Sequence, residues 1–319
     1  MTGAARRHGN VLRELFAIAT ALACAIGAPA CAAAPAAAGE VAAAAGHSPI
    51  DVVDDTGAHL RLAVPARRIV SLAPNLTEQL FAIGAGDALV AVSAFSDYPP
   101  AARALPPVAR AQSVDLEAIV AARPELIVTW GTGYPPQLLQ ALRSLGIPTY
   151  VSEPTTLDSI AESMLRLGAL TGHGEESGRE AARLRAGIAA LRERYASRPT
   201  MTVFYQVWDR PLTTLAGRHV IGEALAACGA RNLFAALAPI SPQVSIEDVV
   251  RGDPDVIVTA EAGGQDRGAL DGWRRFPRMR AVARGALVTL DADRIDRQGP
   301  RIVEGIARLC AEIDRFRAP

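Results

Sequence analysis

One helix–proline–strand unit occurs twice in this chain, and the two copies lie a constant 130 residues apart. The first copy, residues 114–129, reads VDLEAIVAARPELIVT, and the second, residues 244–259, reads VSIEDVVRGDPDVIVT. Each begins with a short helical pattern carrying Glu117 or Glu247 in its first turn, stops at a proline and continues into a β-branched run. Units of this kind are common in α/β proteins, so coincidence is the alternative, but the matching Glu and Pro favour duplication. We therefore expect two related lobes.

Strand patterns alternate with helical patterns along most of the remaining chain. β-Branched runs predict strands at residues 68–72, 88–93, 126–130, 148–152, 202–207, 256–259 and 286–290. This alternation predicts an α/β fold with largely parallel sheets covered by helices on both faces. Residues 175–196 break the alternation with one continuous helical pattern, which would be about 33 Å long at 1.5 Å per residue. The sequence thus predicts two α/β lobes joined by one long helix.

A capping box is predicted at the start of the first helix of the N-terminal lobe. Asn75 belongs to the residue types that cap helices, and Glu78 follows three positions later. The glycines at positions 84 and 86 indicate where this helix ends.

The first residues are typical of a secretory signal. Three arginines precede an apolar run over 15–25, and an Ala/Pro-rich stretch follows it. That run is too short to span a bilayer, which takes about 20 apolar residues. A disordered Ala-rich tail is the alternative, and lipidation at Cys24 or Cys31 is the weaker reading because neither has a Leu three positions before it. We expect export to the periplasm.

The predicted domain boundaries follow from these patterns. Residues 1–38 form the signal peptide and the start of a tether, and 39–66 hold the tether and an N-terminal strand region. The N-terminal lobe is 67–172, the linking helix 173–198 and the C-terminal lobe 199–319.

Composition excludes several classes of function. The 33 basic residues, all of them Arg, balance 33 acidic residues, so the chain lacks the basic surplus of a nucleic-acid binder. Removing residues 1–38 leaves 30 basic and 32 acidic residues. The absence of Lys excludes Schiff-base chemistry and the Walker lysine. No pair among the five His has the spacing of a metal motif, and no G-x-S-x-G elbow occurs, so we expect no enzyme, cofactor or metal.

Four short blocks resemble the helical-backbone (class III) family of periplasmic substrate-binding proteins, which serves cobalamin, siderophore and haem importers. The blocks are SDYPP at 96–100, DLE at 115–117, IVTW at 127–130 and PQVS at 242–245. The first and last resemble the cobalamin-binding branch in particular. The resemblance, over residues 67–315, implies a ligand cleft between two pseudo-symmetric lobes held by a rigid helix. It implies a monomeric receptor that captures cobalamin or a related corrinoid and delivers it to an ABC permease.

A corrin is flat and carries amides around its rim, so its site needs aromatic or apolar faces and a few polar groups. The resemblance implies Tyr98, Asp293 and Arg297 as ligand contacts. Two further aromatic candidates follow from the predicted elements: Trp130 ends a strand, and Tyr134 lies in the loop over 131–136. The resemblance adds Tyr205 and Trp208, which lie near an aromatic position of the family without matching its register. Core packing is the alternative role for each aromatic residue.

The chain departs from the family at three positions where the family has aromatic residues. These are Ala111, Ser241 and Arg294. Because of these departures, a different cobamide, haem and a ferric siderophore remain alternative ligands. Haem would use an axial ligand, for which His219 is the candidate, and an anionic siderophore would use cleft arginines such as Arg210, Arg218 and Arg297. A chelatase-like enzyme, which shares the two-lobed plan, is the remaining alternative.

The family also implies roles for two glutamates and two cysteines. Glu117 and Glu247, the residues singled out by the repeat, match the positions that dock onto arginines of the permease dimer. A first-turn Glu that favours the helix dipole is the alternative reading. Cys228 and Cys310 match family positions joined by a disulfide, which an exported chain can form.

Overall fold

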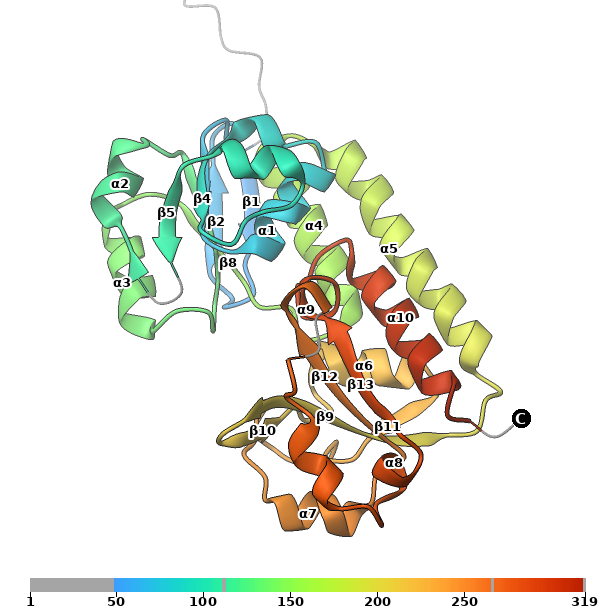
Figure 1. Cartoon of the computed structure of the whole chain (residues 1–319). Coiled ribbons are helices and arrows are strands. Elements are labelled where there is room, and N and C mark those ends of the chain that lie inside the picture. Colours follow the sequence, from blue (N-terminus) through green and yellow to red (C-terminus); the bar gives the residue numbers. More distant parts are fainter. Residues whose placement is uncertain (1–48, 111–112, 265–266, 318–319) are drawn as a thin grey trace, which may run out of the picture. The chain divides into compact units, whose positions relative to one another are not determined.

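The structure is a computed structural model that describes residues 49–110, 113–264 and 267–317 (Figure 1). The predicted signal segment, Cys24, Cys31 and Ala111 lie outside these residues. The described part begins with an antiparallel hairpin of β1 (Ile50–Val53) and β2 (His59–Leu62). The carboxylate of Asp54, in the turn of this hairpin, accepts the backbone N–H of Val151, which ties the hairpin to the N-terminal lobe.

The N-terminal lobe contains a six-stranded sheet with the order β6-β5-β4-β3-β7-β8. Only the β5–β6 pair is antiparallel. The strands are β3 (Ile69–Ser71), β4 (Leu89–Ser93), β5 (Pro107–Arg110), β6 (Ser113–Val114), β7 (Leu126–Trp130) and β8 (Thr149–Ser152).

Both faces of this sheet are buried, because apolar side chains alternate between two clusters. Ile69, Leu126 and Val128 face the first cluster, whereas Val70 and Ile127 face the second. The first face is covered by α1 (Pro74–Ala82) and α4 (Leu157–Thr171), and the second by α2 (Leu116–Ala121) and α3 (Pro136–Ser144).

The C-terminal lobe holds a second mixed sheet with the order β10-β9-β12-β13, in which β11 also pairs with β9. Its strands are β9 (Met201–Asp209), β10 (Leu212–Thr214), β11 (Ala230–Asn232), β12 (Val256–Glu261) and β13 (Leu287–Asp291). Its helices are α6 (Val220–Ala227), α7 (Ile246–Gly252), α8 (Arg280–Ala283), α9 (Ala292–Ile295) and α10 (Ile302–Asp314).

Short 3₁₀ turns occur in both lobes. The N-terminal lobe has η1 (Gly86–Ala88) and η2 (Pro100–Ala104), and the C-terminal lobe has η3 (Ala262–Gly264) and η4 (Asp271–Arg275). The predicted α/β fold with two lobes is confirmed.

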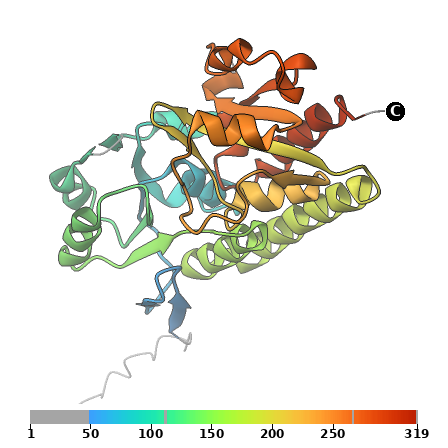
Figure 2. The ribbon, with the colours of Figure 1, turned by 90° about the horizontal axis from the view of Figure 1, so that it is seen from below.

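The long helix α5 (Gly174–Tyr195) is shared by the two lobes. It packs against α4 of the first lobe and against α6 and α10 of the second (Figures 1 and 2). Leu184, Ile188 and Leu191 are buried in one apolar cluster that contains residues of both sheets. Relative motion of the lobes would therefore have to disturb a continuous core.

A disulfide joins Cys228, at the end of α6, to Cys310 in α10, with a sulfur–sulfur distance of 2.01 Å. Both residues are fully buried. The pairing that the family resemblance implied is thus present.

The two repeat units adopt matching backbones. Asp115 caps α2 and Ser245 caps α7, each accepting the N–H three residues on. In both units a left-handed residue directly precedes the proline, Arg123 with φ of 48° after α2 and Asp253 with φ of 41° after α7. These are the only non-glycine residues with positive φ in the described chain. An arginine donates to the turn carbonyl in each copy, Arg68 in the first lobe and Arg280 in the second.

The capping box predicted for α1 is wrong. Ala73 occupies the N-cap position with no side-chain cap, and Pro74 supplies the first helical residue. Asn75 and Glu78 are both buried instead. Glu78 binds arginines of the other lobe, so long-range contacts, which the local pattern does not contain, decide its role.

Candidate functional site

A cavity of about 470 Å³ lies between the lobes at the carboxyl ends of the strands. Trp130 ends β7, Trp208 lies near the end of β9, and Ala260 lies near the end of β12. Ligands of open α/β sheets bind at such strand ends, because the loops that follow converge there. The full lining is Trp130, Thr132, Glu153, Tyr205, Gln206, Val207, Trp208, Leu215, His219, Val220, Ile221, Ile240, Ser241, Ala260, Ile295, Asp296 and Gln298.

Apolar faces at the rim of this cavity remain open to solvent. Trp130 is 37% exposed, Ile240 47% and Trp208 65%. Large apolar side chains left uncovered at a concave site favour a ligand with flat or apolar faces.

Tyr205 forms part of the cavity wall but is 1% exposed. Its hydroxyl donates to Oδ1 of Asp296 at 2.8 Å. Burial raises the pKa of Tyr205 well above its ordinary value, so the phenol stays neutral and remains the donor. Tyr205 therefore acts mainly by fixing Asp296.

His219 lines the same cavity at the N-cap of α6. Its Nδ1 accepts the backbone N–H of Ile221 at 3.1 Å, which leaves the ring proton on Nε2. Burial lowers the pKa of His219, so the ring stays neutral.

A smaller hollow of about 150 Å³ adjoins Trp130 in the N-terminal lobe. Tyr134 lines it, and its hydroxyl donates to the carbonyl of Leu72 at 2.8 Å. Phe95, 64% exposed, lines it as well. This aromatic residue was missed by sequence reasoning, although it lies two positions after a predicted strand.

Asp293 and Arg297 do not line the main cavity but belong to an ion cluster that links the lobes. Arg297 donates to Glu78 at 2.9 Å and to Asp97 at 2.7 Å, both in the N-terminal lobe, and pairs with Asp293 at 2.8 Å. Burial alone would lower the pKa of Arg297, but hydrogen bonding to Asp97 and Glu78 raises it overall. The charge of Arg297 is thus compensated within the protein.

Tyr98 belongs to the same cluster through a cation–π contact. The guanidinium of Arg301 lies 3.9 Å from the centre of the Tyr98 ring. Arg301 also donates to both carboxylate oxygens of Glu78, at 2.6 and 2.8 Å. Glu78, whose side chain is 2% exposed, therefore binds both Arg297 and Arg301.

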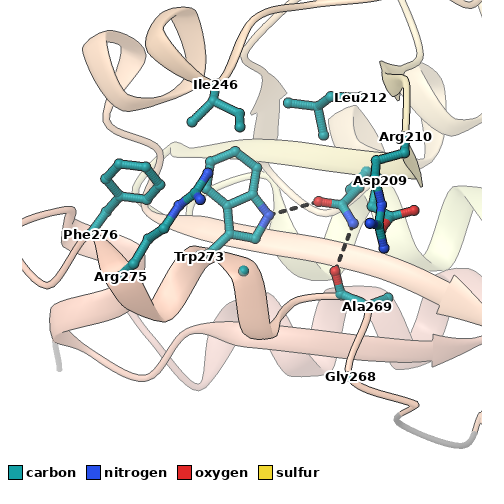
Figure 3. A pocket seen from close by; sticks show the side chains of 11 residues that line it. Asp209, Arg210, Leu212, Ile246, Gly268, Ala269, Trp273, Arg275 and Phe276 are labelled. Carbon is teal, nitrogen blue, oxygen red and sulfur yellow. Dashed lines mark hydrogen bonds and ion pairs between the residues drawn. The ribbon is translucent and has the colours of Figure 1, made fainter.

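A separate cavity of about 410 Å³ lies within the C-terminal lobe behind Gln206 (Figure 3). The indole N–H of Trp273 donates to Oε1 of Gln206 at 2.7 Å, and Nε2 of Gln206 donates to the carbonyl of Ala269 at 2.9 Å. Gln206 also lines the inter-lobe cavity. Its amide is held on both sides, so it forms a fixed wall between the two spaces.

Of the positions that depart from the family, two lie in the described chain. Ser241 lines the inter-lobe cavity, so at this one position of the lining a hydroxyl replaces an aromatic ring. Arg294 pairs with Asp291 and Glu304 outside that cavity. Ala111 lies outside the described residues.

Glu117 and Glu247 are exposed in the first turns of α2 and α7. Among the residues that the structure describes, neither carboxylate takes part in an ion pair. Both remain available to an external cation.

The cavity residues that sequence reasoning missed come from loops as well as from strands and helices. Those in loops include Thr132, Glu153, Ile240, Asp296 and Gln298. Those in strands and helices are Gln206, Val207, Val220, Ile221, Ala260 and Ile295. For Asp296 and Gln298, the only sequence signal is that they stand close to the predicted residues Asp293 and Arg297. The other missed residues have no such signal.

Within the described residues, no helix is both long and apolar enough to cross a membrane.

The two-lobed fold with its cavity at the strand ends suits a binding protein, and comparison with known proteins identifies the class. The family model described as "Periplasmic binding protein" matches residues 69–294, so the chain belongs to the periplasmic binding protein family. This is a family of binding proteins without enzymatic activity.

Among relatives, the vitamin B12-binding protein of Photorhabdus laumondii is 39% identical over 256 residues, covering 80% of this chain and 90% of the relative. The vitamin B12-binding protein of Vibrio cholerae serotype O1 is 39% identical over 246 residues, with coverages of 77% and 88%.

Solved structures extend the comparison. The periplasmic vitamin B12-binding protein BtuF of Vibrio cholerae superposes with a TM-score of 0.71 at 38% identity, covering 79% of this chain and 98% of that one. The periplasmic heme-binding protein RhuT of Roseiflexus sp. RS-1, in its apo form, gives a TM-score of 0.70 at 25% identity, with coverages of 79% and 99%.

Proposed function

We propose that this chain is a periplasmic receptor that captures cobalamin or a related corrinoid and delivers it to the permease of an ABC importer. The observation that carries the proposal is the 39% identity to a vitamin B12-binding protein over 90% of that protein's length. The match spans both lobes, and so includes the elements that build the cleft between them.

The chemistry of the cleft supports a ligand that is flat and largely neutral. Trp130 and Trp208 offer aromatic faces from opposite lobes. The ion cluster compensates Arg297 with three carboxylates, so this arginine does not favour an anionic ligand. We propose Trp130 and Trp208 as the stacking faces, with Tyr205 in the wall behind them. Tyr98, Tyr134, Asp293 and Arg297 lie outside the main cavity, and we propose them as contacts to the parts of the ligand that extend beyond it.

Haem and ferric siderophores are the second candidates, because a haem-binding protein shares the fold. The geometry of His219 argues against haem. Ligation through Nε2 would move the ring proton to Nδ1, where it would face the N–H of Ile221 that now donates to this atom. Arg210, a candidate for siderophore binding, is exposed and pairs with Asp209.

Calorimetric titration of the purified mature protein tests the ligand. We expect cyanocobalamin to bind with a Kd of about 1 μM or lower, equivalent to about −8 kcal/mol. Haemin and a ferric hydroxamate siderophore should bind at least about tenfold more weakly. Tight haemin or siderophore binding together with no heat from cyanocobalamin would refute the proposal.

We propose that Glu117 and Glu247 dock onto cations of the permease, one on each lobe. Their support is their matched place in the repeat, their exposure and their lack of ion pairs in the described chain. A dimeric permease can meet two related lobes with two related surfaces. Export of the chain through its N-terminal segment, with release at a signal cleavage site, belongs to the same proposal.

The double variant Glu117→Ala/Glu247→Ala should abolish most corrinoid uptake in cells while leaving cyanocobalamin affinity unchanged. Radiolabelled uptake and calorimetry measure the two quantities. The matched control is Glu175→Ala/Glu193→Ala, which removes two exposed carboxylates of α5 and should leave uptake normal. Normal uptake by the first double variant, at normal periplasmic levels, would show that these glutamates are not the docking residues.

A further inference from the structure

Two adjoining hollows lie beside α7 in the C-terminal lobe, and together they form a surface that we call the α7 groove. The first is the cavity of about 410 Å³ behind Gln206 (Figure 3), and the second, of about 490 Å³, lies further along α7. Ile246 lines the first and Val250 the second, and residues four apart share one face of a helix. Arg275 and Phe276 line both hollows, so the hollows meet at these two residues.

The floor of the α7 groove is apolar and firmly packed. Trp273 in the first hollow and Met279 in the second are 4% and 3% exposed. The hydrogen bond of its indole N–H holds Trp273 in place. Ile246, Val250 and Phe276 are half-buried and keep apolar surface in contact with water. Apolar surface in a preformed hollow favours the binding of an apolar side chain of a partner.

Two arginines of the α7 groove have no carboxylate partner. Arg275 lines both hollows and Arg278 lines the second; both are exposed, and among the described residues neither takes part in an ion pair. The two carboxylates that line the groove are already paired. Asp209 pairs with the arginine that follows it at 3.2 Å, and Asp253 pairs with Arg280 at 2.9 Å. The groove therefore offers two cations to an acidic partner.

The α7 groove adjoins the glutamate proposed for docking. Ile246, which lines the first hollow, directly precedes Glu247 in the first turn of α7. A partner whose cation reaches Glu247 therefore lies beside the groove.

We propose that the α7 groove binds a periplasmic segment of the permease that carries carboxylates beside an apolar side chain. This inference rests on the proposed function, which supplies the permease as the partner. Arg275 and Arg278 pair with the carboxylates, since a guanidinium fits a carboxylate in bidentate geometry, and the apolar side chain packs on Trp273 or Met279. An anionic lipid headgroup can pair with the same arginines, but it leaves the apolar floor uncovered.

The groove gives the docking surface of this lobe charges of both signs. Glu247 attracts a cation of the permease, whereas Arg275 and Arg278 attract carboxylates next to it. Such a pattern fixes the register of the two proteins and disfavours a permease that lacks the matching carboxylates.

The experiment measures binding of the cyanocobalamin-loaded mature protein to the corrinoid importer of the same organism in lipid nanodiscs. The charge-reversal variant, Arg275→Glu/Arg278→Glu, should bind the importer about tenfold more weakly than wild type, because like charges would then meet. Its calorimetric affinity for cyanocobalamin should be unchanged. The variant Arg275→Lys/Arg278→Lys keeps both charges and should retain most of the affinity for the importer. Thermal unfolding confirms that both variants fold.

Arg194→Glu/Arg284→Glu is the matched control, because it changes the net charge of the protein by the same amount. Arg194 and Arg284 are exposed, line neither hollow and take part in no ion pair within the described residues. Arg194 also lies over an aromatic ring, as Arg275 does. We expect the control to bind the importer like wild type.

The outcomes separate this inference from the proposed function. Wild-type affinity of the charge-reversal variant for the importer, or equal weakening by the control, would overturn the groove alone. Binding of wild type to nanodiscs without the importer, lost in the charge-reversal variant, would assign the groove to lipid headgroups and refute the permease segment. A wild-type protein that binds neither cyanocobalamin nor the importer would overturn the proposed function and this inference with it.

Discussion

The variant Glu78→Gln should lower the free energy of unfolding by about 3–5 kcal/mol, the usual cost of removing one partner from a buried ion pair. The Glu78 side chain is 2% exposed, and its partners Arg297 and Arg301 are 14% and 15% exposed. A neutral amide would leave the largely buried guanidinium of Arg301 without a carboxylate partner among the described residues, whereas Arg297 would keep Asp97 and Asp293. Urea denaturation followed by circular dichroism measures the change.

Glu312→Gln provides the control because it removes a carboxylate of similar burial that also pairs with two arginines. Glu312 is 8% exposed, but Arg308 and Arg315 are 70% and 68% exposed and can regain hydration. We expect this variant to lose about 1 kcal/mol or less. Equal losses in the two variants would show that the inter-lobe position of Glu78 has no special effect on stability.

The lobes could be predicted because their signals are local. The repeat at residues 114–129 and 244–259 contains both the periodicity of a short helix and the β-branched run of the next strand. In the structure, α2 and α7 lie within these two segments, and strands β7 and β12 begin within them. The long helix α5 begins and ends one residue earlier than predicted.

The role of Glu78 could not be predicted, because its partners lie 219 and 223 residues away. A Glu three positions after an Asn suggests a capping box, but both residues are buried, and Glu78 binds arginines of the other lobe. The same limit applies to Asp296 and Gln298, whose place on the cavity wall depends on the loop after α9. Trp130 was accessible to prediction because it ends a strand, and strand ends in α/β lobes converge on the cleft. Trp208, which also lines the cavity, was singled out by the family resemblance and not by its local pattern.

Breaking the Cys228–Cys310 disulfide should lower the free energy of unfolding by about 4 kcal/mol. The bond closes a loop of 82 residues and so reduces the conformational entropy of the unfolded chain; without the bond, the unfolded chain regains that entropy. The bond joins α6 to α10, two helices that both pack on α5, so it also secures the core shared by the lobes. Cys310→Ala alone already breaks the bond and should lose nearly as much as Cys228→Ala/Cys310→Ala. Urea denaturation of both variants, and of the wild type with reductant, measures the loss. A double variant less than about 1 kcal/mol below wild type would contradict a stabilising role.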